Sequence, residues 1–219
     1  MRRHLELTRP FVDRDAFNPD LPVPTVAVTR RVATDGFMLE ELALCTHVGT
    51  HMDAPSHVLE GAPGVDDYPL DRLSGRAVIA DVRGLGDDAR IGAEVLEDLL
   101  GPLSEPGCIV LFLTGWGDLR GPSDRYINHS PWLDGEGADW LVDQAVVGVV
   151  IDHFSISGRG PVDQTLPAHT QLLGAGIWIV EDALLPEELL MSAWRVTALP
   201  LRLAAASGAP TRVIAEEIT

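Results

Sequence analysis

One of the two common basic residue types is missing from this sequence. It contains no lysine, so all 16 basic residues are arginine, and 33 acidic residues give a formal net charge of −17. Nucleic-acid binding draws most of its affinity from phosphates neutralised by a basic patch. The acidic balance therefore excludes nucleic acid as the main partner. An acidic excess is typical of a soluble surface, but where carboxylates cluster with histidines it indicates a cation site.

Cysteines and long apolar runs are also scarce. Cys45 and Cys108 can form at most one disulfide and lack the C-x-x-C spacing of redox and metal motifs. We therefore expect two reduced core thiols and a cytoplasmic protein. No apolar run of roughly 18 residues is present, and no apolar signal region follows the basic N-terminal residues. The sequence thus predicts neither secretion nor a membrane partner.

What is present is the composition of a globular domain. The 219 residues are 46% hydrophobic and 22% charged. On folding, chains of this size bury about 70–75% of the surface that the unfolded chain exposes, so they need no disulfides or structural metals to be stable. No repeat of roughly 20–50 residues and no low-complexity block divides the chain. We predict one domain spanning residues 1–219.

Apolar segments alternate in a pattern that predicts an α/β fold. An opening hairpin is expected over residues 23–32 and 37–45, with Asp35-Gly36 at its turn. Helical spacing is found in residues 91–99 and 138–145, and a short helix is expected at residues 167–173. Strands, most of them buried on both faces, are expected at residues 77–82, 108–113, 146–151, 177–180, 194–203 and 211–218. Together these predict a mixed sheet carrying helices.

Three of the seven histidines fall within eleven residues, in the string His-Val-Gly-Thr-His-Met-Asp-Ala-Pro-Ser-His that begins at His47. Gly49, Thr50 and Pro55 disfavour a helix, so we interpret the string as a loop leaving the strand that ends near Cys45. Loops on a rigid scaffold commonly carry chemistry.

The donor atoms of this string suit a transition metal. His47, His51 and Asp53 offer two imidazoles and a carboxylate, a set that binds Zn²⁺, Mn²⁺, Fe²⁺ or Co²⁺ and leaves a position open for an activated water. His57 is either a fourth ligand or a proton carrier, because its ordinary pKa suits general acid–base catalysis. The alternative is that the histidines are merely structural, although each imidazole would then need a partner in the core.

The string resembles the H-x-G-T-H-x-D-x-P-x-H motif of the cyclase family, whose best-known members are bacterial kynurenine formamidases. The similarity continues from about residue 40 through residues 69–70, 77–82, 148–152, 166–169, 177–181 and 199–201. The resemblance implies a swivelling β/β/α fold, which is a mixed sheet or partial barrel with flanking helices. It also implies assembly as a homodimer or homotetramer.

The resemblance further implies a metal centre on His47, His51 and Asp53. In family members with two ions, the same Asp bridges to a second ion held by a His and a Glu, which here are His169 and Glu181. We expect His169 to open a short helix and Glu181 to end an apolar strand, the edge where open α/β sheets place ligands. The expected cofactor is Zn²⁺, one or two ions per chain, with Mn²⁺ as the alternative. By the same resemblance His57 is the catalytic histidine.

The sequence departs from the family pattern after Ile151. Members often read Asp-Thr-x-Ser there, whereas this chain reads Asp152-His153-Phe154-Ser155, so His153 either shapes the site or lies on the surface. After His169, Thr170 stands where a second histidine is common. Four aromatic residues either line a substrate pocket or pack in the core: Trp116, Trp132, Phe154 and Trp178.

These observations lead to one main functional hypothesis. The protein is a metal-dependent hydrolase that cleaves an amide carbon–nitrogen bond of a small molecule, an N-formyl arylamine such as N-formylkynurenine of tryptophan catabolism, with His57 as general acid/base. Two alternatives within the family are a hydrolase of cyclic amides or lactones and a cyclase of secondary metabolism. An alternative of another class is a catalytically silent metal-binding subunit.

Overall fold

A ring of seven strands forms the centre of the molecule. The structure, a computed structural model, describes residues 2–15 and 18–218. Neighbouring strands in the ring run in the order β12-β11-β5-β7-β9-β10-β4, and β4 pairs with β12 to close it. The strands are β4 (His51–Asp53), β5 (Ser74–Asp81), β7 (Ile109–Leu113), β9 (Gly148–Ile151), β10 (Trp178–Glu181), β11 (Ala193–Pro200) and β12 (Gly208–Ile218). Strands β5, β7, β9 and β10 are parallel, and the other pairs are antiparallel.

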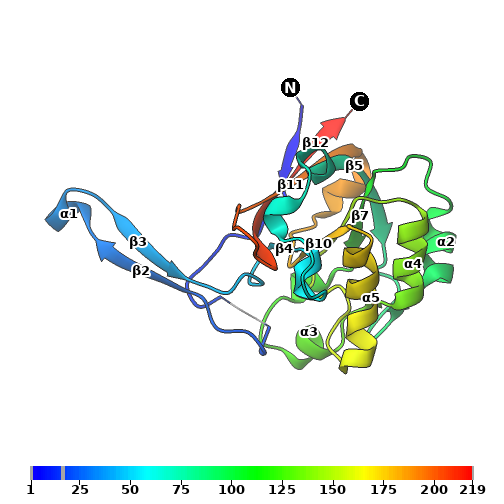
Figure 1. The fold of residues 1–219 in the computed structure, drawn as a ribbon, viewed down its shortest axis with the longest axis horizontal. Coiled ribbons are helices and arrows are strands. Elements are labelled where there is room, and N and C mark those ends of the chain that lie inside the picture. The colour runs from blue at the N-terminus through cyan, green and yellow to red at the C-terminus, as the bar shows by residue number, and fades with distance from the viewer. Residues whose placement is uncertain (1, 16–17, 219) are drawn as a thin grey trace.

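Three helices cover one side of this ring (Figure 1). They are α2 (Ala93–Leu100), α4 (Gly135–Asp143) and α5 (Val162–Gly174), and α4 packs against both of the others. The predicted mixed α/β partial barrel with flanking helices is therefore confirmed. Apart from an arm described below, the other elements are β1 (His4–Glu6), which pairs with β12, β6 (Arg90–Ile91), β8 (Trp132–Leu133), α3 (Asp124–Asn128) and several 3₁₀ turns.

The central strands are buried on both faces because their side chains alternate between two cores. In β7, Ile109, Leu111 and Leu113 belong to a core cluster that includes Trp178, whereas Val110 and Phe112 pack with the residues that meet the helices. This alternation follows from the two-residue period of a strand. It explains the continuous apolar runs from which these strands were predicted.

Helix α5 differs from its prediction in a way that matters for the site. It begins at Val162, not near residue 167, and Pro167 lies inside it. Proline is most common at the first helical position, and inside a helix it costs one backbone hydrogen bond and crowds the preceding turn, so a helix that continues through Pro167 could not be expected from the sequence. The expectation that His169 opens a short helix is therefore wrong, because His169 lies in the second half of a 13-residue helix.

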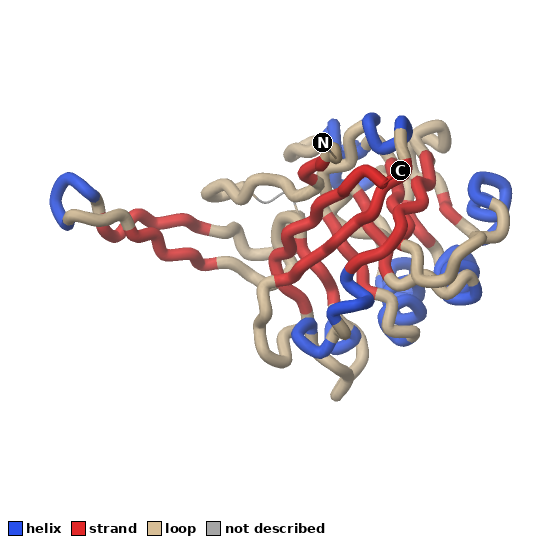
Figure 2. Tube along the Cα trace, turned by 90° about the horizontal axis from the view of Figure 1, so that it is seen from above, coloured by secondary structure: helices blue, strands red, loops and turns tan. Residues whose placement is uncertain are grey.

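A two-stranded arm projects from the body, and both views show it (Figures 1 and 2). Strands β2 (Thr25–Arg30) and β3 (Leu39–Ala43) pair antiparallel, so the predicted hairpin is confirmed. The turn between them contains the helical turn α1 (Val32–Asp35), which ends at Gly36 in the left-handed conformation with φ of 80°. The exposed large apolar side chains of the arm are Val28, Val32, Phe37, Met38, Leu39 and Leu42.

Cys45 and Cys108 are both free thiols. Cys108 is buried beside β7, but Cys45 is half-buried in the loop after the arm, so only one of the two is a core residue. Among the helices of the described residues, none has the length and apolarity that a membrane crossing requires.

Candidate metal centre

Two strands and one helix position the candidate ligands. His51 and Asp53 project from the same face of β4, while Met52 between them points into the core and is fully buried. Glu181, the last residue of β10, is the register partner of His51. Residues 47–57 were predicted as one loop, and this is wrong in part, because His51–Asp53 form a strand and Pro55–His57 form a 3₁₀ turn. Helix α5 supplies His169.

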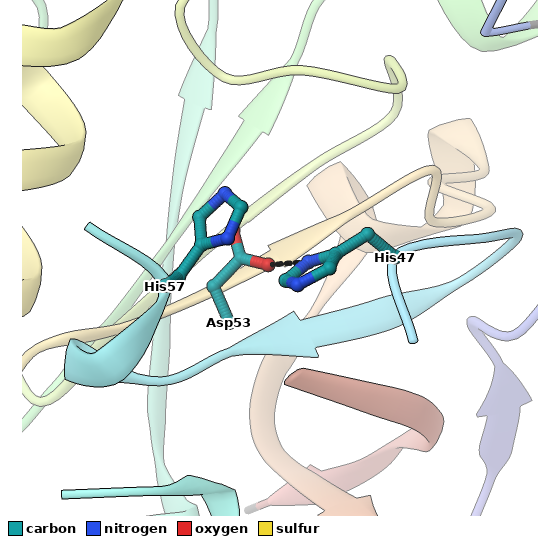
Figure 3. Close-up of side chains that lie close together, drawn as sticks. All are labelled: His47, Asp53 and His57. Carbon is teal, nitrogen blue, oxygen red and sulfur yellow. Dashed lines mark hydrogen bonds and ion pairs between the residues drawn. The ribbon is translucent and has the colours of Figure 1, made fainter. Parts of the chain in front are cut away.

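The side chains converge on Asp53. Its Oδ1 lies 2.7 Å from His47 Nδ1 and 3.4 Å from His51 Nε2, and its Oδ2 lies 3.9 Å from His169 Nε2. Glu181 closes the group, with Oε2 3.6 Å from His51 Nε2 and Oε1 3.3 Å from His169 Nε2. Figure 3 shows the side chains of His47, Asp53 and His57 close together, with His47 bonded to the Asp53 carboxylate.

Two overlapping groups of these residues have the spacing of metal ligands. One ligand atom from each of His51, Asp53 and Glu181 lies within 4.8 Å of the others, and the same holds for His47, Asp53 and His57. Asp53 Oδ2 is buried and has no hydrogen-bond partner among the described residues. An unpaired buried carboxylate oxygen is costly, and imidazole with carboxylate is the donor set of Zn²⁺ and Mn²⁺ sites. The residues therefore fit a divalent ion.

Further contacts fix the orientation of the imidazole rings. His51 Nδ1 lies 2.8 Å from the Gly49 carbonyl, His47 Nε2 lies 2.9 Å from Ser207 Oγ, and His169 Nδ1 lies 3.0 Å from Ser157 Oγ. Such contacts select the tautomer and direct the free nitrogen toward an ion. Sequence reasoning missed Ser157 and Ser207, since no motif surrounds either of them.

The electrostatics of the cluster favour bound cations. Burial opposes protonation of His51 and His169, but bonds and charges from Asp53 and Glu181 outweigh it and raise the pKa of each to about 9. Burial also acts to raise the pKa of Asp53, yet hydrogen bonds with His47 and His51 hold it well below its usual range. The two carboxylates thus attract positive charge, as protons or as a metal ion.

His57 differs from the other histidines of the cluster because it is exposed to solvent, whereas His51 and His169 are buried and His47 is half-buried. Its ring lies beside the cluster, with its centroid 4.1 Å from that of His47 and 6.0 Å from that of His169. Partial burial lowers the pKa of His57; the charge of Asp53 opposes this shift, and the charges of His47 and His169 reinforce it. A neutral imidazole at this position can accept a proton.

A cavity of about 310 Å³ opens onto the cluster. Its wall contains the apolar side chains of Leu21, Val58, Phe154 and Leu166. Of the four aromatic residues considered above, Phe154 lines this cavity and packs in a buried cluster with Trp116, Trp178 belongs to the main core, and Trp132 is half-buried and does not line the cavity.

His153 lies behind the wall of the cavity and not on the surface of the molecule. It is fully buried, with ring nitrogens 2.9 Å from the Tyr126 carbonyl and 3.0 Å from the Ser155 carbonyl. The surface alternative for His153 is therefore wrong. Its neighbours Phe154 and Ser155 both line the cavity, so His153 supports the cavity wall from behind.

Comparisons with known proteins identify the family. Residues 5–157 match the family model Cyclase, described as "Putative cyclase". The chain is 34% identical over 177 residues to a kynurenine formamidase of Salinibacter ruber, covering 80% of this chain and 78% of that protein. It is 31% identical over 179 residues to cyclase-like protein 3 of Oryza sativa subsp. japonica, covering 80% of this chain but only 64% of that protein's length. The chain belongs to the cyclase family.

Solved structures share the fold over the whole chain. Isatin hydrolase A from Labrenzia aggregata, bound to benzyl benzoate, superimposes with a TM-score of 0.88 at 24% identity. The match covers 100% of this chain and 94% of that structure. At this level of identity the likeness establishes the common architecture.

Proposed function

We propose that this protein is a metal-dependent hydrolase that cleaves an amide carbon–nitrogen bond outside peptides. The observation that carries the proposal is the convergence of His47, His51, His169, Asp53 and Glu181 at the end of a partly apolar cavity. The kynurenine formamidase and isatin hydrolase relatives support a hydrolase of this class.

In this proposal those five residues are the metal ligands, and Asp53 is shared between ions where two are bound. The cofactor is Zn²⁺, one or two ions per chain, with Mn²⁺ as the alternative. When bound, such an ion supplies a Lewis acid that lowers the pKa of water toward neutrality and polarises a carbonyl. The unpaired Oδ2 of Asp53 and the directed imidazole nitrogens support this assignment.

His57 is the proposed general acid/base. It reaches the cavity, and its lowered pKa keeps it neutral near pH 7, so it accepts a proton from the attacking water and delivers it to the leaving nitrogen. The proposed substrate is a small N-formyl arylamine such as N-formylkynurenine. Leu21, Val58 and Phe154 offer an apolar surface for its ring.

The test is hydrolysis of N-formylkynurenine by the metal-reconstituted protein, a chelated sample and the His57→Ala variant. We expect chelation to abolish turnover, and His57→Ala to keep its metal content but lose kcat roughly 10²–10⁴-fold. His129→Ala is the matched control, because the His129 side chain is 39% exposed, bonds to Asp88 and Asp124, and does not line the cavity. Full activity of His57→Ala would remove it from the chemistry.

The same assay separates the alternatives. Hydrolysis of a cyclic amide or lactone without formamide cleavage would favour the second substrate class. Stoichiometric metal with no hydrolysis of formamides, cyclic amides or esters would favour the catalytically silent subunit.

We also propose that residues 1–219 act as one cytoplasmic domain in a homodimer or homotetramer. The arm supports the association, since an isolated two-stranded hairpin is marginally stable in water and its apolar side chains are exposed. A second copy of the chain would cover them. Val28→Asp combined with Leu42→Asp should then give a monomer in light scattering, and an unchanged mass would contradict this.

A further inference from the structure

The cavity beside the metal centre also contains a pair of opposite charges. Asp20 and Arg159 line it together with His57, His169 and Glu181. Arg159 Nε donates to Asp20 Oδ2 at 3.0 Å and Nη2 donates to Oδ1 at 3.1 Å, so the pair is bidentate. Among the described residues that line the cavity, these two carry the permanent charges outside the histidine and Glu181 cluster.

The chain holds Arg159 in place independently of Asp20. Its Nη1 donates to Asn128 Oδ1 at 2.9 Å, a contact that survives when Asp20 is displaced. It lies between Gly158 and Gly160 in the loop between β9 and α5. Gly158 has φ of 66°, and a Cβ there would lie 3.1 Å from the Cβ of Trp132, so the loop fits closely against its neighbour.

The pair is accessible to a ligand. The side chains of Arg159 and Asp20 are 38% and 63% exposed, and exposed ion pairs contribute little net stability. A ligand that offers a partner to each charge can therefore separate them at small cost. Each charge then keeps a charge-assisted hydrogen bond.

We propose that Asp20 and Arg159 recognise a zwitterionic α-amino acid group on the substrate. Its carboxylate binds the guanidinium of Arg159, and its ammonium binds the carboxylate of Asp20. In an α-amino acid the ammonium and the carboxylate are attached to the same carbon. They therefore lie side by side, as the side chains of Asp20 and Arg159 do in the cavity. The inference rests on the proposed function and narrows its substrates to aryl formamides that carry an α-amino acid group, which should be preferred over aryl formamides without charged groups.

The experiment compares two substrates that differ in this group alone. They are N-formylkynurenine and 2-formamidoacetophenone, which keeps the aryl ketone and the formamide but lacks the amino acid. The readout is the ratio of their kcat/KM values. We expect Arg159→Met and Asp20→Asn each to lower this ratio roughly tenfold or more, mainly through KM for N-formylkynurenine, and Arg159→Lys to restore part of it.

Arg125→Met is the matched control. Arg125 forms a similar exposed bidentate pair with Asp87, and neither residue lines the cavity. The ratio should not change in this variant. If Arg159→Met reduces kcat/KM for both substrates equally, the ion pair has a structural role only and the inference is overturned. An unchanged ratio overturns it as well.

A binding measurement keeps this inference separate from the proposed reaction. Calorimetry compares kynurenine with 2-aminoacetophenone on the metal-loaded protein. If neither formamide is hydrolysed, the proposed function fails. Tighter binding of kynurenine that is lost in Arg159→Met still supports the recognition site, and equal binding of the two probes refutes it.

Discussion

One methyl group added to β12 should disturb the metal centre without changing any donor atom. Gly208 is the register partner of Asp53, and a Cβ at this position would lie 2.6 Å from Cε1 of His47 and 2.7 Å from the Met52 carbonyl oxygen. Ordinary contacts begin at 3.4 Å, so in Gly208→Ala the ring must retreat by about 0.8 Å. Metal–ligand distances tolerate roughly 0.2 Å.

The expected magnitude follows from how His47 is held. Its ring bonds to Asp53 at 2.7 Å and to Ser207 at 2.9 Å, and a retreat of this size breaks at least one of these contacts. Loss of such orienting contacts reduces metal affinity roughly 10–100-fold. Ser207→Ala, which removes one contact and adds no volume, should give a smaller loss of the same kind.

Chelator competition with Zn²⁺ measures the affinity, and circular dichroism with thermal melting measures the fold. Gly84→Ala is the matched control, because a Cβ there meets no described atom within 4 Å. If folded Gly208→Ala binds Zn²⁺ as tightly as the parent and Ser207→Ala does too, His47 is not a ligand held by this contact, and the reasoning is refuted.

Three further predictions concern proton release on metal binding, stabilisation of the fold by the metal, and the effect of a substitution in the core. With pKa values of about 9, His51 and His169 are protonated in the metal-free protein at pH 7.5, so metal binding should release about two protons and weaken as the pH falls; calorimetry in buffers of different ionisation enthalpy that detects no release contradicts this. Zn²⁺ at 100 times its Kd should stabilise the fold by about 2.7 kcal/mol, and an unchanged Tm after chelation argues against a site in the native state. Trp178→Ala should lower the free energy of unfolding by about 3–5 kcal/mol, measured in urea, because the ring is fully buried; a loss below about 1 kcal/mol would mean that the core collapses around the cavity.

The sequence predicts the central strands well and β4 poorly. Strands β7 and β9 are continuous apolar runs buried on both faces, a local signal. Strand β4 has three residues, two of them ionisable, and is held by pairing with residues 179–181 and 208–210. Nothing within the His47–His57 string indicates those partners, so residues 51–53 were assigned to a loop.

A local sequence signal likewise predicts only part of the candidate site. His47, His51, Asp53 and His57 form one readable string, whereas His169 and Glu181 followed from the family resemblance. The structure brings all six residues together, but it places His169 well inside α5, because Pro167 does not begin the helix. The charge pair of Asp20 and Arg159 joins positions 139 residues apart, and no local pattern connects them.

Because β12 closes the ring against β4, the complete site can form only late in the synthesis of the chain. Both neighbours of β4 lie far downstream, and one of them, β12, contains Gly208–Pro210. A ribosome that has translated His47 through Glu181 has made every proposed ligand and β10, one of the two strands that pair with Asp53, but not β12, which closes the ring. The closed ring around the metal centre therefore forms late, when β12 leaves the exit tunnel, and we expect shorter chains to bind an ion more weakly than the full chain.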